Sequence, residues 1–154
     1  MNDQAEGLRR WAERQALLRR QLPPRRVLML VGEPARAPEL SLLALGALQR
    51  WQASGHQWVG DPRRWQVVPL AADAAHLQAL VNHQKRWGLW VDNDLQGARR
   101  AYLQLRQLRA AGGPRQLLVL HPGCPADAPV LNNLRAAAAR FLGVRLVLVE
   151  ERAA

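Results

Sequence analysis

A chain of 154 residues, of which 49% are hydrophobic, is long enough to bury the core of a single domain. The only cysteine, Cys124, excludes an internal disulfide, and no Cys and His residues cluster at the spacing of a structural zinc site. The formal net charge of +10 favours a polyanionic partner, either nucleic acid or an acidic protein surface.

The first predicted element is an amphipathic helix over residues 3–21. Trp11 and Leu18 share its apolar face, while arginines occupy the other faces. Such side chains on an exposed helix bind a protein partner or a second copy of the chain. Two consecutive prolines follow, and they separate this helix with its break, residues 1–24, from a single α/β domain, residues 25–154.

Within the α/β domain, short apolar runs alternate with longer patterns of helical spacing. The connections are too long for hairpins, so we expect right-handed crossovers and a three-layer open sheet of about five mostly parallel strands. The near-continuous apolar character of the runs agrees with burial on both faces of the sheet. The predicted strands cover residues 27–31, 65–70, 88–91, 116–120 and 144–149, and the helices between them cover 38–54, 73–80, 95–111 and 128–142.

Two aspartates follow the third predicted strand. Asp92 and Asp94 stand where an apolar strand gives way to a helix, the position at which open α/β sheets bind ligands. Gly97 relieves crowding at the first helical turn, and the two carboxylates could hold a divalent cation. The alternative is structural, because Asp94 is also a preferred helix N-cap and Asp92 could bond its own turn.

Several positions around this pair match a known family motif. They are, in chain order, Asp92-Asn93-Asp94, Gly97, Pro122-Gly123 and Asp127, with a predicted strand between the two halves. Over residues 86–134, the chain therefore resembles the Toprim domains of primases and topoisomerases. The resemblance implies a Toprim-like α/β fold, a nucleic-acid substrate and a magnesium ion held by Asp92 and Asp94.

The same resemblance implies a catalytic glutamate just after the first strand, acting as a general acid or base. Glu33 lies at the carboxyl end of the first predicted strand and would take this role at the same sheet edge as Asp92. The family places a glycine after its glutamate, whereas Gly32 precedes Glu33 here. The sequence therefore suggests a catalytic group without naming a reaction.

A second resemblance competes with the first. The strand at residues 27–31 followed by a helix, with Asp92 ending the third strand, is similar to receiver domains of response regulators. Those domains use two acidic residues after the first strand and a lysine after the fifth, whereas this chain offers Glu33 alone and then Glu150 and Glu151. This resemblance implies a flavodoxin-like module that binds protein partners without catalysis.

Tryptophans and basic residues interleave in the middle of the chain. Aromatic rings stack on bases while basic groups neutralise phosphates. Two simpler explanations stay open: the tryptophans pack in the core or anchor a loop, and a GC-rich genome favours arginine, which supplies 21 of the 22 basic residues. The predicted nucleic-acid contacts are Arg63, Arg64, Lys85, Arg86, Arg99 and Arg100.

Other cofactors are not expected. Gly32 stands alone after the first strand, without a dinucleotide fingerprint or a phosphate-binding loop, so we expect neither NAD nor flavin, and no zinc. No apolar run is long enough to span a bilayer, and the first residues lack the pattern of a secretory signal. We therefore expect a cytoplasmic protein without a membrane partner.

Overall fold

The structure is a computed structural model that describes residues 3–21, 26–33, 37–123 and 129–150. Several predictions concern parts of the chain outside the described residues. They are those on the two prolines at 23 and 24, on Cys124, on Asp127 and on the side chain of Leu18.

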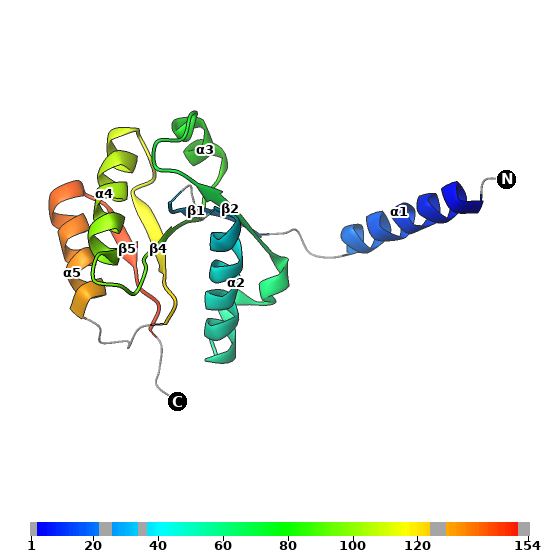
Figure 1. The fold of residues 1–154 in the computed structure, drawn as a ribbon, viewed down its shortest axis with the longest axis horizontal. Helices are drawn as coiled ribbons and strands as arrows, with labels where there is room; N and C mark the ends of the chain where they lie inside the picture. The colour runs from blue at the N-terminus through cyan, green and yellow to red at the C-terminus, as the bar shows by residue number, and fades with distance from the viewer. Residues whose placement is uncertain (1–2, 22–25, 34–36, 124–128, 151–154) are drawn as a thin grey trace.

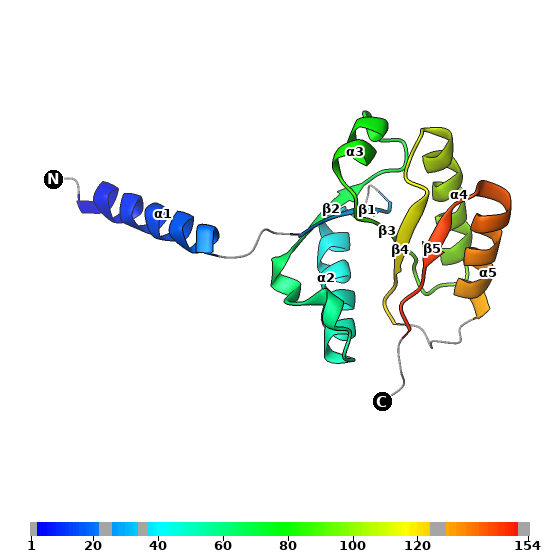
Figure 2. The same ribbon diagram turned by 180° about the vertical axis from the view of Figure 1, so that it is seen from behind.

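Helix α1, Asp3–Gln21, confirms the first predicted element. It stands apart from the sheet and the other helices (Figures 1 and 2). Two of its apolar side chains, Leu8 and Trp11, are 69% and 61% exposed. The apolar face predicted for this helix therefore remains open where its side chains are described.

Five parallel strands form one sheet in the order β2-β1-β3-β4-β5, which confirms the predicted fold class. The chain moves outward from β1 to β2 and then returns past β1 to β3, so the order reverses between β1 and β3. Open sheets of this flavodoxin-like order bind ligands at that reversal. The strands are β1 (Arg26–Val31), β2 (Trp65–Leu70), β3 (Trp87–Trp90), β4 (Gln116–Leu120) and β5 (Arg145–Val147).

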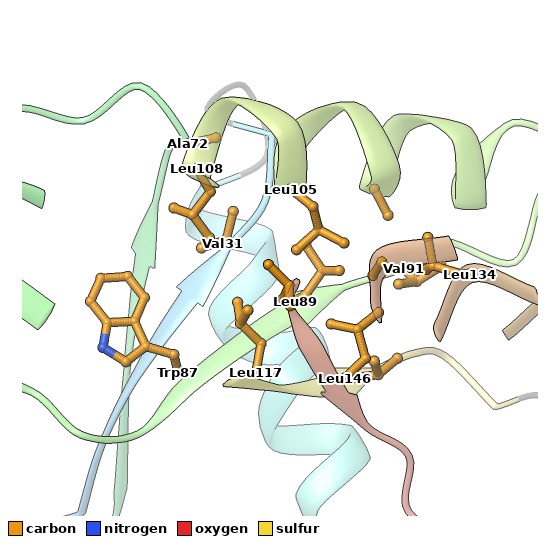
Figure 3. Close-up of a cluster of buried hydrophobic side chains, with 14 of the residues drawn as sticks. Val31, Ala72, Trp87, Leu89, Val91, Leu105, Leu108, Leu117, Leu134 and Leu146 are labelled. Atoms are coloured by element: carbon orange, nitrogen blue, oxygen red, sulfur yellow. The ribbon is translucent and has the colours of Figure 1, made fainter. Parts of the chain in front are cut away.

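Helices cover both faces of the sheet (Figures 1 and 2). On one face, α2 packs against the sheet and fully buries its own Trp51 in the core beneath it. On the other face, residues of α3, α4 and α5 form a second core with the central strands. Figure 3 shows Leu105 of α4 above Leu89 of β3 and Leu117 of β4 in this core. None of the described helices combines the length and apolar character that crossing a bilayer requires. The bounds are α2 (Ala37–Ala53), α3 (Leu77–His83), α4 (Gly97–Ala110) and α5 (Pro129–Ala137), the last continuing as a π-helical turn, Ala138–Leu142.

Packing on both faces explains why β3 has no polar position. All four of its residues are buried. Trp87 and Leu89 contribute to the core beneath α3 and α4, whereas Trp90 contributes to the core beneath α2. A strand with one face in water would alternate polar and apolar residues. The continuous apolar run therefore reflects a central strand.

Two predicted helix starts are wrong. Asp73 does not begin α3, because His76 adopts a left-handed conformation, with φ of 62°, and the helix starts only after it. Asp94 does not occupy the N-cap of α4, which is Gln96; its side chain accepts a hydrogen bond from the Gln96 backbone instead. The last strand ends at Val147, earlier than predicted.

Candidate functional site

Three acidic residues gather at the carboxyl edge of the sheet, beside the reversal of strand order. Glu33 follows β1, and Asp92 and Asp94 follow β3. Residues that follow neighbouring parallel strands meet at one edge. The structure therefore brings the predicted general acid or base close to the predicted magnesium ligands.

Arg100, in the first turn of α4, lies among these carboxylates. Its Nη2 atom donates a hydrogen bond to Asp94 Oδ2 at 2.6 Å and lies 3.6 Å from Asp92 Oδ2. Its Nε atom lies 3.3 Å from Glu33 Oε1. Arg100 was predicted to contact nucleic acid, but in the structure its guanidinium group compensates three carboxylates of the same domain.

Further hydrogen bonds orient the two aspartates. Trp90 Nε1 donates to Asp92 Oδ1 at 2.9 Å, and the backbone N–H of Gln96 donates to Asp94 Oδ1 at 2.9 Å. The hydrogen bond from Arg100 is the main cause that lowers the pKa of Asp94 below its usual range, and the same bond raises the pKa of Arg100. Asp94 is therefore ionised and paired at neutral pH.

The cleft around this acidic cluster is narrow. It holds about 10 Å³ of open space, roughly the room for one water molecule. A divalent cation would have to displace Arg100 or share its carboxylates, and among the described residues no group of three or more His, Cys, Asp or Glu side chains is arranged to hold a metal ion.

Basic residues line the opposite, amino edge of the sheet. Each strand begins with, or directly follows, an arginine or a lysine. Because all neighbouring strands are parallel, these side chains share one edge, and all but the partly buried Arg64 are exposed. Across the sheet they are Arg63 and Arg64 before β2, Arg26 in β1, Lys85 and Arg86 before β3, Arg115 before β4 and Arg145 in β5. We call these seven residues the basic edge.

A hollow of about 410 Å³ opens beside the basic edge. Its volume lies in the range of small-molecule sites. The described residues that line it are apolar, aromatic, basic or amide side chains, with no acidic group among them. They are Arg26, Trp58, Trp65, Lys85, Arg86, Trp87, Gln116, Leu118 and Val147.

The tryptophans divide between the core and this hollow. Trp51 and Trp90 are 0% and 5% exposed, which confirms that they pack in the core. Trp58 is 43% exposed, and its ring centroid lies 6.0 Å from that of Trp51 and 6.4 Å from that of Trp65. These contacts anchor the 3-10 turn Gln57–Val59, and they leave part of Trp58 open at the hollow.

The predicted nucleic-acid contacts fall into two groups. Lys85 and Arg86 line the hollow. Arg63 and Arg64 also belong to the basic edge, but β1 separates them from Lys85 and Arg86, and Arg63 pairs with Asp61 at 3.0 Å. The remaining two, Arg99 and Arg100, lie in the first turn of α4 at the carboxyl edge instead.

The sequence prediction missed three members of the basic edge. Arg26, Arg115 and Arg145 each stand at the start of an apolar run, so the signal was present in the sequence. Arg26 also supports the hollow directly: its guanidinium carbon lies 5.5 Å from the ring centroid of Trp65, and it donates a hydrogen bond to the Trp58 carbonyl oxygen.

Comparisons with protein-family models, with curated proteins and with solved structures found no match. Functional assignment therefore depends on the two edges of the sheet.

Proposed function

We propose that this domain binds nucleic acid along the basic edge of its sheet. The observation that carries the proposal is the placement of an arginine or lysine at the start of every strand of a parallel sheet. Four interstrand spacings make this edge about 19 Å wide. Basic side chains that neutralise phosphates release counterions, which supplies binding that does not depend on sequence.

The acidic cluster has no part in this proposal. Arg100 compensates Glu33, Asp92 and Asp94, and the cleft between them is almost filled. Magnesium at Asp92 and Asp94, catalysis by Glu33 and the Toprim-like assignment stay predictions. The proposed activity is therefore binding, and no catalytic reaction is assigned.

Paired substitutions at the two edges of the sheet test this proposal. The double variant Lys85→Ala, Arg86→Ala removes two exposed charges from the basic edge. The control, Arg99→Ala, Arg106→Ala, removes two exposed charges from α4 and leaves the same net charge. Binding of a labelled oligonucleotide is followed by fluorescence anisotropy at fixed salt.

We expect the basic-edge variant to bind at least about tenfold more weakly than the wild type. The α4 variant should bind within about twofold of the wild type, since its charges lie outside the basic edge. Equal losses in the two variants would mean that the total charge, rather than the basic edge, attracts the oligonucleotide. Absence of binding by the wild type would end the proposal.

A second candidate function concerns α1, which we propose pairs with the same helix of a second copy. In proteins, most of the stability of a helix comes from packing of its apolar face, and Leu8 and Trp11 are exposed one turn apart on one side of α1. Leu8→Ala, Trp11→Ala should convert a dimer to a monomer in light scattering. The control Leu42→Ala removes a 72% exposed leucine of α2 and should leave the mass unchanged. A monomeric wild type would exclude this pairing.

A further inference from the structure

The hollow beside the basic edge combines features that a charged surface does not need. Val147 of β5 and Leu118 of β4 are register partners and give it an apolar part, and Trp58 and Trp65 give it an aromatic part. Phosphate binding requires only basic groups. A site of about 410 Å³ with apolar and aromatic lining fits a planar aromatic group as well.

The side chains of the hollow are also held in place. Trp58 contacts Trp65 edge to face, with an interplanar angle of 83°. Trp65 Nε1 donates a hydrogen bond to the carbonyl oxygen of Val59 at 2.8 Å, in the same turn as Trp58. Arg26 lies over the ring of Trp65. A ligand that enters the hollow therefore meets preformed aromatic edges and faces, so little ordering is required on binding.

We propose that the hollow takes one unstacked base of a single-stranded nucleic acid. The base contacts Trp58, while the flanking phosphates contact Lys85 and Arg86, which line the same hollow and are exposed. Gln116 supplies an amide that can donate to and accept from a base edge. This inference rests on the proposed function, because it names the substrate class for the basic edge.

We choose a single strand because its bases can reach the hollow. In a duplex the bases are stacked and paired inside the helix, and a protein that binds one in a pocket must first extrude it. In a single strand an unstacked base is available, and its aromatic face can contact Trp58. Base contact of this kind tolerates different sequences.

Three ligands of equal length test the inference on the wild-type chain: oligo(dT), an oligonucleotide of abasic sites and a duplex. The abasic strand carries the same phosphates without bases. Stacking contributes between about 5-fold and about 150-fold per base, so we expect oligo(dT) to bind at least about 5-fold more tightly than the abasic strand. We also expect it to bind more tightly than the duplex.

Variants at position 58 test whether the preference for oligo(dT) over the abasic strand arises in the hollow. Trp58→Ala should remove the preference for oligo(dT) over the abasic strand, and Trp58→Phe should retain much of it, because a smaller ring still stacks. The abasic strand should bind all three proteins alike. If Trp58→Ala fails to fold, the three ligands are compared on the wild type and on Trp58→Phe, and that comparison still tests the base site.

The outcomes separate this inference from the proposed function. Equal affinity for oligo(dT) and the abasic strand would overturn the base site, while the basic edge would remain a phosphate-binding surface. Tighter binding of the duplex would also overturn it. If none of the three ligands binds, both the base site and the proposed function are lost.

Discussion

Gly97 and Asp92 approach each other so closely that a Cβ atom at position 97 would lie 2.0 Å from the Asp92 carbonyl oxygen. This approach joins the start of α4 to the end of β3. Arg100 follows Gly97 by about one helical turn, so it lies on the same side of α4. The contact thereby positions the guanidinium group of Arg100 beside the carboxylates of Asp92 and Asp94.

Replacing Gly97 by alanine should destabilise the fold by about 1–3 kcal/mol, because the new methyl group meets backbone that cannot rotate away. Chemical unfolding measures the change. Gly46→Ala is the matched control: at this helical glycine of α2, a methyl group would meet no atom within 4 Å, so we expect it to stabilise by about 0.5–1 kcal/mol. A neutral Gly97→Ala would contradict the close contact.

The acidic cluster predicts a specific acid dependence of stability. The Arg100 hydrogen bond lowers the pKa of folded Asp94 below its ordinary value of 3.8. The folded state then binds fewer protons than the unfolded chain, so this contribution is complete above about pH 4 and is lost as the pH falls through the lowered value. Asp94→Asn should therefore be less stable than the wild type at neutral pH, and the difference should shrink below about pH 4.

Chemical unfolding at a series of pH values measures that difference. The control Asp73→Asn removes an exposed carboxylate that lies outside the acidic cluster. A constant gap between the wild type and Asp94→Asn at all pH values would mean that the Asp94 carboxylate is not stabilised by Arg100.

Arg100 should compete with a divalent cation for the acidic cluster. Arg100→Gln removes the positive charge that Glu33, Asp92 and Asp94 share, so we expect it to bind Mn²⁺ at least about tenfold more tightly than the wild type does. Tryptophan fluorescence reports binding, because Trp90 donates a hydrogen bond to Asp92. A fluorescence change that persists in the double variant Asp92→Asn, Asp94→Asn would report Mn²⁺ bound at another site. Equal Mn²⁺ affinity of the wild type and Arg100→Gln would contradict the competition.

Salt should reveal how many phosphates the basic edge contacts. For single strands, the slope of log K against log salt changes by about 0.7 for each phosphate neutralised. Lys85→Ala, Arg86→Ala should therefore reduce the slope by about 1.4, whereas Arg99→Ala, Arg106→Ala should leave it unchanged. Anisotropy titrations between about 50 and 200 mM salt measure the slope. An unchanged slope in the first variant would place the phosphates elsewhere.

Much of the fold follows from local pattern. Each apolar run became a strand and each helical pattern between them a helix, because burial on both faces of a parallel sheet demands continuous apolar residues. The wrong predictions concern the ends of helices and strands, where the backbone conformation of a single residue determines the boundary. His76 is an example: because its backbone is left-handed, α3 starts only after it. The periodicity of the sequence does not reveal that conformation.

The parallel α/β class is readable from the order of residues along the chain, and so is the edge at which each charged group lies. The sequence itself places a basic residue at the start of each strand or directly before it, and acidic residues after β1 and β3. Because the strands are parallel, these residues form a basic edge and an acidic cluster.

What those charged and aromatic groups contact is set by the packing of distant segments. Arg100 pairs with Glu33, which lies 67 positions away in the sequence, because α4 packs against the end of β3. Likewise Trp58 and Val147 line one hollow, although 89 positions separate them, because the sheet joins β2 and β1 to β4 and β5 through β3. No local pattern encodes such contacts, since each depends on where another part of the chain comes to lie.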